Sequence, residues 1–123
     1  MKIVVIDARR TPIAKSCSKT GIFRRIRADT LSGTLLGEMW RGPLESVCDP
    51  SAVIWGCARQ HAEQGFNIAR QASIEGGLPP ALPAMSVNRN CSSGLDAILV
   101  GGCRIATGQD DAVIAGGVDR KST

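Results

Sequence analysis

The sequence predicts an α/β domain with a mostly parallel sheet, in the element order βαβαβαβ. Short apolar runs suited to strands alternate with longer stretches in which apolar residues recur at helical spacing. Glycine and proline stand at many of the junctions, where they end one element before the next begins. Strands that alternate with helices pair in parallel through right-handed crossovers, so we expect helices on both faces of the sheet.

Four strands are expected, at residues 3–6, 52–57, 85–87 and 112–115. The first is a continuous β-branched run, Ile3-Val4-Val5-Ile6, and the second and fourth are also continuously apolar. Runs of this kind are typical of strands that are covered on both faces. The sheet is therefore expected to lie in the middle of the domain.

Three helices are expected between the strands. The first begins at Asp29, a residue type that caps helices well, and ends before the Gly-Pro pair at 42–43. The second spans residues 68–75 and is capped by Asn67. The third spans residues 95–105 and has few strongly polar side chains, so it is apolar on nearly every side.

The third helix has a consequence for the surface of the chain. A helix that is apolar all round needs protein on every side, so we expect it to be buried. One four-stranded sheet covers only one of its sides. We therefore predict that the chain on its own exposes an apolar patch and associates with itself or with a partner.

Cys91 is the candidate nucleophile. It follows the strand at 85–87 and precedes the helix at 95–105. A cysteine at a helix N-terminus meets the positive end of the helix dipole and unpaired N–H groups, which favour the thiolate. The small residues at 92–94 let a substrate carbonyl approach main-chain donors, as an acyl-transfer site requires. A free cysteine is also a small hydrophobe that is often simply buried, so position alone leaves both interpretations open.

The other four cysteines have weaker claims to a chemical role. Cys57 ends an apolar strand and Cys103 lies on the apolar helix, so we expect both in the core. Cys17 and Cys48 lie in polar, loop-like surroundings and have no assigned role. We expect Cys91 to react faster with alkylating agents than Cys17 does.

Length and composition exclude several classes of protein. The chain has 123 residues, enough for one domain with a core, and its 43% hydrophobic and 21% charged residues exclude disorder. Five cysteines without a C-x-x-C pair, and a single histidine, support neither a disulfide framework nor a metal site. Scarce aromatic residues argue against nucleic-acid binding by base stacking. Without an apolar run of membrane-spanning or signal-peptide length, the chain is expected in the reducing cytoplasm, with no integral membrane association.

The positive charge gathers near the start of the chain. Between residues 9 and 27 the chain has seven basic residues and no acidic one: Arg9, Arg10, Lys15, Lys19, Arg24, Arg25 and Arg27. Such a segment could meet nucleic acid, an acidic partner subunit or an anionic substrate such as a nucleotide-tailed thioester. A solvated loop is the simplest interpretation, because charge runs often do no more than keep a surface in water.

Taken together, three motifs resemble the N-terminal half of the thiolase family. They are Arg10-Thr11-Pro12, then Asn88-x-x-Cys91-x-Ser93-Gly94, then Ala115-Gly116-Gly117, and the resemblance covers the whole chain. Two further blocks are similar to the bacterial thiolases that form the β subunit of the fatty-acid oxidation complex. They are Ser18-Lys19-x-Gly21-x-Phe23-Arg24 with Arg27-Ala28-Asp29, and Glu63-Gln64-Gly65-Phe66-Asn67-Ile68-Ala69-Arg70.

This resemblance implies an acyltransferase that cleaves 3-ketoacyl-CoA to acetyl-CoA and a shortened acyl-CoA. Cys91 would be the covalent nucleophile that carries the acyl group, and its backbone N–H would contribute to an oxyanion hole. Coenzyme A would be a substrate, with no separate cofactor and no metal. The implied partners are further copies of the chain and the hydratase/dehydrogenase α subunit of the β-oxidation complex.

The resemblance also implies that part of a thiolase is missing. The family carries its catalytic histidine and a second catalytic cysteine on a C-terminal half, so residues 1–123 would be a truncated N-terminal domain without that half and without most of the loop domain. The only histidine, His61, does not match the catalytic motif and is interpreted as a loop residue. Asp119 stands where thiolases usually have Glu. We therefore expect the isolated chain to be inactive.

Two alternatives to this function stay open from the sequence. One is a noncatalytic remnant of a thiolase that packs against a partner as an interaction module. The other is a condensing enzyme related to the ketoacyl synthases, which place a cysteine similarly. The presence or absence of a base that can act on Cys91 separates the first alternative from the enzyme.

Overall fold

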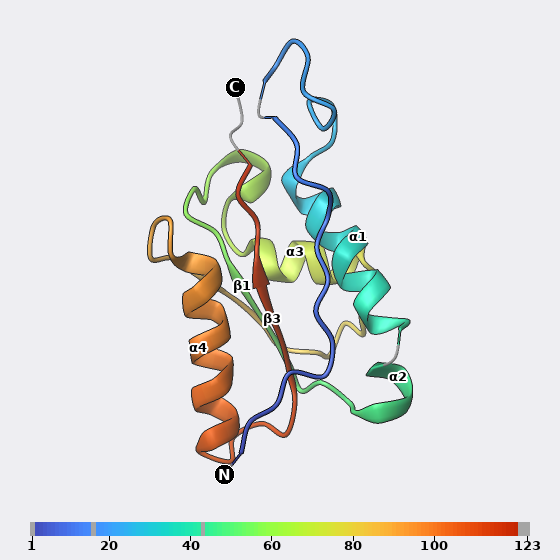
Figure 1. Cartoon of the computed structure of the whole chain (residues 1–123), viewed down its shortest axis with the longest axis vertical. Coiled ribbons are helices and arrows are strands. Elements are labelled where there is room, and N and C mark those ends of the chain that lie inside the picture. Colours follow the sequence, from blue (N-terminus) through green and yellow to red (C-terminus); the bar gives the residue numbers. More distant parts are fainter. Residues whose placement is uncertain (1, 16, 43, 121–123) are drawn as a thin grey trace.

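The computed structural model describes residues 2–15, 17–42 and 44–120 (Figure 1). The element order is α1 (Ala28–Trp40), α2 (Leu44–Val47), β1 (Ala52–Gly56), the 3-10 helix η1 (Ala62–Gln64), α3 (Ile68–Glu75), β2 (Ala84–Val87), α4 (Ser93–Ala106) and β3 (Val113–Gly117). The three strands form a parallel sheet in the order β2-β1-β3. The predicted α/β class is confirmed, with three strands in the sheet instead of four.

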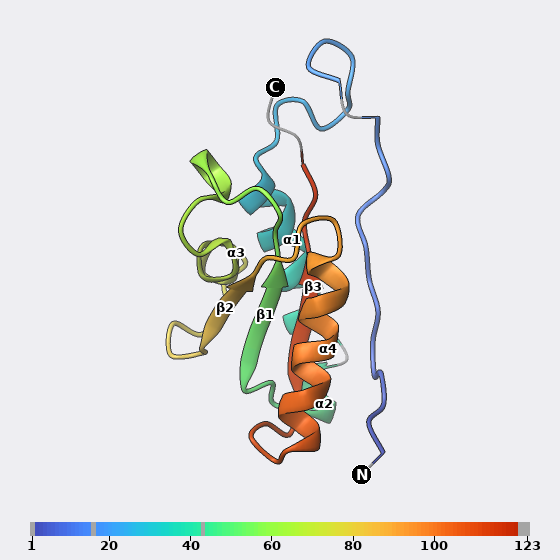
Figure 2. The same cartoon turned by 90° about the vertical axis from the view of Figure 1, so that its left-hand side faces the viewer.

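Helices cover both faces of this sheet, as predicted. α4 lies along one face, and α1 and α3 pack on the other (Figures 1 and 2). The central strand β1 is buried along its whole length because its side chains alternate between the two layers. Ile54 faces α4, whereas the indole N–H of Trp55 donates to the Ser32 hydroxyl of α1 at 3.1 Å. The core therefore centres on β1.

The strand predicted at residues 3–6 is wrong for this chain. The segment is extended but joins no sheet, and Figure 2 shows it running beside the body of the molecule. Its side chains are largely exposed, up to 81% for Val5. A cavity of about 840 Å³, lined by this segment, β3 and α4, lies beside β3. A strand requires a hydrogen-bonded neighbour, and within the described residues none pairs with residues 3–6.

The third helix is covered on one side only, as predicted for this chain on its own. α4 forms as expected, but only Ser93, Ala97 and Gly101 are buried, and these residues face the sheet. Leu95 is 62% exposed, and Leu99 is 54% exposed. The sheet covers one side of α4, and no second layer among the described residues covers the other. The expectation that the chain exposes apolar side chains on this helix is thereby confirmed.

Of the two predicted N-terminal caps, that of α3 is confirmed and that of α1 is wrong. Asn67 caps α3 as predicted, because its side-chain oxygen accepts from the backbone N–H of Arg70 at 3.2 Å. Asp29 does not cap α1, which begins at Ala28 with Arg27 in the cap position. Its carboxylate instead pairs with the Arg27 guanidinium at 2.6 Å. Over the described residues, no helix combines the length and apolar character needed to cross a membrane.

The start of α4 lies unusually close to the end of β1. A Cβ placed on Gly56 would lie 2.3 Å from the carbonyl carbon and oxygen of Ser93, which is far inside van der Waals contact. A Cβ on Gly117 would lie 2.8 Å from the Gly56 carbonyl oxygen and 3.1 Å from the Cα of Gly94. Glycine at 56 and 117 therefore permits the helix to begin directly against the strand ends.

We expect Gly56→Ala to lower the free energy of unfolding by about 1–3 kcal/mol, because the added methyl group meets backbone atoms that have no rotamer to change. Gly102→Ala in α4 is the matched control, since a Cβ there meets no atom closer than 3.9 Å. The control should be neutral or stabilising by about 0.5–1 kcal/mol, the usual gain from alanine in a helix. Urea denaturation measures both, and equal effects of the two substitutions would contradict the close approach.

Candidate functional site

Cys91 lies in a tight turn between β2 and α4, just beyond the carboxyl ends of the parallel strands. This is the edge where open α/β sheets bind ligands. Its side chain is exposed, so a reagent can reach the sulfur. Cys57 is buried as predicted, whereas Cys103 is exposed on the uncovered side of α4, so its predicted burial is wrong.

The turn around Cys91 is fixed by its own polar groups. The Asn88 amide donates to the Ala58 carbonyl at 3.2 Å, and its side-chain oxygen accepts from the Asn90 N–H at 2.9 Å. The backbone N–H of Ser92 donates to the Arg89 carbonyl at 3.2 Å. Asn90 has a φ of 51°, a left-handed conformation that asparagine tolerates better than most residues. Cys91 therefore follows a turn with a defined shape.

Ser93, the first residue of α4, joins the turn to the helix. Its hydroxyl donates to the Asn90 carbonyl at 2.6 Å and accepts from the Arg89 N–H at 2.9 Å. The Arg89 guanidinium pairs with Asp96 in the first turn of α4 at 2.8 Å. An acidic residue in that turn is favourable to the helix dipole. The turn and the helix start thus form one hydrogen-bonded unit.

Residues 63–70 hold in place the strand that leads into this turn. The Asn67 amide donates to the Ala84 carbonyl at 2.9 Å, and the Ser86 hydroxyl donates to Asn67 Oδ1 at 2.9 Å. α3 is thereby tied to β2, the strand that leads into the turn. Gln64, which is buried, donates to the Arg120 carbonyl at 3.1 Å. These side chains hold neighbouring loops together and do not approach the Cys91 sulfur through any hydrogen bond among the described residues.

His61 is an exposed loop residue, as predicted, and precedes η1. No hydrogen bond links its ring to Cys91 in the part of the chain that the structure describes. The site as it stands therefore has an exposed thiol, the candidate nucleophile, at the start of α4, and the described side chains include no base bonded to it. Its chemistry is that of a thiol presented for attack on a carbonyl.

The basic segment before Asp29 mostly serves the fold locally. Arg9 pairs with Asp7 at 2.8 Å, and the Arg24 guanidinium donates to the Gly21 carbonyl at 3.1 Å. Lys15, Lys19 and Arg25 are exposed. The exposed residues fit the interpretation of a solvated loop, whereas Arg9 and Arg24 stabilise local structure.

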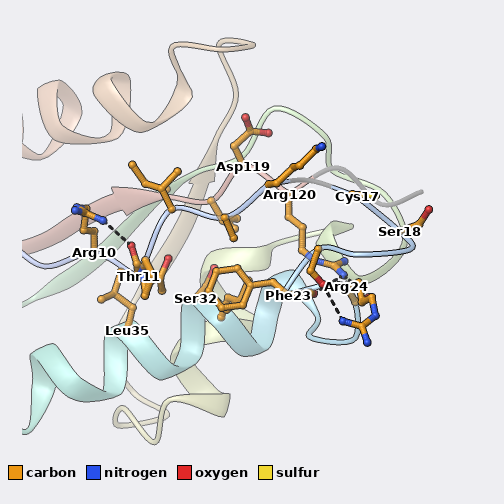
Figure 3. A pocket seen from close by; sticks show the side chains of 18 of the residues that line it. Arg10, Thr11, Cys17, Ser18, Phe23, Arg24, Ser32, Leu35, Asp119 and Arg120 are labelled. Atoms are coloured by element: carbon orange, nitrogen blue, oxygen red, sulfur yellow. Dashed lines mark hydrogen bonds between the residues drawn. The ribbon is translucent and has the colours of Figure 1, made fainter.

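This segment also borders a second cavity of about 370 Å³, on the α1 side of the sheet (Figure 3). Phe23 and Arg24 come from the loop before α1, Ser32 and Leu35 come from α1 itself, and Asp119 follows β3. Cys91 does not line this cavity. The cavity is therefore separate from the candidate nucleophile.

Cys17, to which the sequence assigned no role, lines this second cavity. Its surroundings favour the thiolate, which argues against the expectation that Cys17 is the slower of the two thiols to be alkylated. A hydrogen bond from the Thr20 side chain, with further bonds from backbone N–H groups of the same turn, lowers the pKa of Cys17 from 9.0 to about 7. The signal available in the sequence was a threonine three residues later, followed by Gly21. Burial acts in the opposite direction on Cys57 and raises the pKa of its thiol.

We expect Cys17 to be alkylated by iodoacetamide with a midpoint near pH 7, because the thiolate is the reactive form. Thr20→Val removes the hydroxyl and should move this midpoint towards 9.0. Lys19→Gln, which removes a neighbouring charge and leaves the Thr20 hydroxyl in place, is the control and should move it less. Mass mapping of labelled peptides across pH measures the midpoint, and an unchanged profile in Thr20→Val would refute the hydrogen-bond origin of the shift.

Comparisons with known proteins agree with this architecture. Residues 3–123 match the family described as thiolase, N-terminal domain. A 3-ketoacyl-CoA thiolase of Shewanella frigidimarina is 47% identical over 117 residues, and one of Colwellia psychrerythraea is 42% identical over 119 residues. These alignments cover 94% and 96% of this chain, and 30% of each relative.

A solved structure gives the same result. The crystal structure of the Bacillus anthracis acetyl-CoA acetyltransferase superposes with a TM-score of 0.70 at 28% sequence identity. The superposition covers 80% of this chain and 25% of that one. The chain thus spans about a third of the length of its relatives or less. On its sequence and its fold, this chain belongs to the thiolase family and corresponds to the N-terminal domain.

Proposed function

We propose that this chain carries the nucleophile of a 3-ketoacyl-CoA thiolase, an acyltransferase of fatty-acid β-oxidation. The observation that carries the proposal is the exposed Cys91 at the start of α4, in a chain 42–47% identical to proteins of that name. Membership of the family supports an enzyme, and the position of Cys91 supports its role as the acyl carrier.

The proposed reaction follows from a thiolate that meets a 3-keto carbonyl. The sulfur of Cys91 bonds to C3 of the 3-ketoacyl-CoA while the bond between C2 and C3 breaks, and C2 takes up a proton as acetyl-CoA leaves. The thiol sulfur of a second coenzyme A then bonds to the acyl carbon while the bond from that carbon to the Cys91 sulfur breaks. The shortened acyl-CoA leaves, and the proton of the coenzyme A thiol passes to Cys91. Main-chain N–H groups at the start of α4 would stabilise the oxyanion in both steps.

Coenzyme A enters this scheme as a substrate, and the chain is proposed to act without a metal or a resident cofactor. All five cysteines are free, which is consistent with the reducing conditions of the cytoplasm. We therefore place the proposed activity there.

The apolar side chains on α4 and residues 3–6 support a proposal about partners. In our proposal the part of a thiolase that lies outside the region matched by this chain covers Leu95, Leu99 and the cavity beside β3. Further copies of the chain and the α subunit of the β-oxidation complex would bind outside that layer.

One observation favours the alternative of a noncatalytic packing module. Within the described residues no histidine bonds to Cys91, and His61 lies exposed in a loop. A thiol without a base can accept an acyl group slowly but cannot sustain rapid turnover. The enzyme and the packing module therefore differ in whether turnover appears when the C-terminal part of a thiolase is added.

For the isolated chain we expect slow acetylation of Cys91 by acetyl-CoA and no measurable thiolysis of 3-ketoacyl-CoA. Positioned proton transfer contributes about 10²- to 10⁴-fold to such reactions, and the groups for it are absent from the described site. Fusion to the C-terminal part of a 3-ketoacyl-CoA thiolase should restore turnover. Peptide mass mapping and thioester absorbance measure the two activities.

The matched controls are Cys91→Ser, which should abolish the acetyl label, and Cys103→Ser, which removes another exposed thiol and should preserve it. Robust thiolysis by the isolated chain would show that its own residues suffice. A fusion protein that folds but stays inactive would favour the packing module.

We expect the purified chain to bind a hydrophobic dye and to self-associate, because α4 has no cover on its outer side. The double substitution Ile98→Gln with Leu99→Gln should reduce both effects. Ile74→Gln is the control, since Ile74 is equally exposed but lies on α3, away from this face. Sedimentation and dye fluorescence measure the outcome, and a monodisperse monomer that binds no dye would overturn the proposed interface.

A further inference from the structure

The hydroxyl of Ser93 makes contacts that a helix cap does not make. A serine at a helix start usually accepts a hydrogen bond from an N–H of the first turn. Ser93 instead turns back along the chain, donating to the Asn90 carbonyl at 2.6 Å and accepting from the Arg89 N–H at 2.9 Å. Ser92, in the cap position, makes no side-chain capping bond either. Neither hydroxyl therefore binds an N–H group of α4, and the backbone N–H of Ser93 donates to the Asn90 carbonyl at 3.1 Å.

Ser93 also lies directly against the sheet. The residue is 4% exposed, and its carbonyl group occupies the space that a Cβ on Gly56 would need. A side chain anchored in this way has little freedom to move. Its two hydrogen bonds therefore fix Arg89 and Asn90, the two residues before Cys91, relative to the sheet.

The turn that these bonds hold has a conformation that needs support. Asn90 has a φ of 51°, and residues in sparsely populated backbone regions persist only where their surroundings hold them. The Ser93 hydroxyl bonds directly to the Asn90 carbonyl, at the peptide unit that leads into Cys91. Loss of that bond would let the Cys91 sulfur and the main-chain donors of α4 shift relative to each other.

We propose that Ser93 is a positioning residue for the nucleophile, which fixes Cys91 against the N–H groups at the start of α4. The proposal rests on the proposed role of Cys91. In acyl transfer the Cys91 sulfur bonds to the thioester carbonyl carbon, the bond from that carbon to the sulfur of coenzyme A breaks, and the released thiol takes the proton that Cys91 lost. This step requires the sulfur and the oxyanion donors in register, whereas alkylation by iodoacetamide requires an accessible thiolate but no oxyanion donors.

The test compares Ser93→Ala with Ser73→Ala in the whole chain. Ser73 is the matched control because its hydroxyl is equally buried and donates to the Ala69 carbonyl at 2.7 Å, within α3. Three rates are measured: acetylation of Cys91 by acetyl-CoA, alkylation of Cys91 by iodoacetamide, and hydrogen exchange of the Arg89 amide. Urea denaturation reports the loss of stability in each variant.

Ser93→Ala should lower acetylation about 10- to 100-fold, as small misplacements of reacting groups do, and should change alkylation less than about 3-fold. Exchange of the Arg89 amide should rise, since its acceptor is gone. Ser73→Ala should lower stability without changing the ratio of acetylation to alkylation. The pair Ser93→Thr and Ser93→Val, which are equal in size, isolates the hydroxyl if Ser93→Ala folds poorly, and the threonine variant should be acetylated faster.

An unchanged ratio of acetylation to alkylation in Ser93→Ala, or equal rates in the threonine and valine variants, would overturn the positioning role. An Arg89 amide that stays protected in Ser93→Ala would overturn the hydrogen bond on which it depends. Absence of any acetylation in the unsubstituted chain would overturn the proposed function itself, and Arg89 exchange would still report whether Ser93 holds the turn.

Discussion

The candidate site depends on the close packing of the start of α4 against the ends of β1 and β3. Gly56 and Gly117 leave no side chain between the strand ends and the helix, so backbone meets backbone. The N–H groups of the first helical turn are therefore held at the carboxyl edge of the sheet, beside Cys91. A side chain at either position would push the helix away, and the turn that carries the nucleophile would move with it.

A second layer of polar contacts supports this arrangement from the other side of the sheet. Asn67 caps α3 and at the same time bonds to Ala84 and Ser86 of β2. Because β2 leads directly into the turn of Cys91, the position of α3 helps to determine where the turn begins. The block of sequence around Asn67 thus helps to place the turn of Cys91, the candidate nucleophile, although none of its side chains bonds to Cys91 among the described residues.

The sequence predicted those elements whose signals are local. The Asn67 cap, the α3 span and the strand before Cys91 all follow from turn chemistry and short apolar runs, and the structure confirms them. The burial of residues 3–6 and of Cys103 was predicted wrongly, and these errors have one cause. An apolar pattern records that a segment is suited to burial, whereas actual burial requires a neighbour, and the described chain supplies none on that side.

The contacts of Ser93 and the lowered pKa of Cys17 were beyond sequence reasoning for a different reason. Both depend on which way a small side chain turns within a loop. A serine at a helix start is expected to cap the helix, and only the fold shows that this one bonds backwards to the turn. Local propensity identifies the residue types of a site but leaves the direction of their hydrogen bonds undetermined.

The described site lacks a cover over the apolar side of α4 and a base for Cys91, and both would have to come from the same side of the molecule. Leu95 lies in the first turn of α4, immediately after the turn of Cys91, and Leu99 lies one turn further along the same helix face. Both side chains are more than half exposed. In our proposal, a layer of protein that covers these leucines comes within reach of the Cys91 sulfur, which is itself exposed. The same partner surface that would complete the apolar core is therefore placed to bring the proton acceptor that the described residues do not provide.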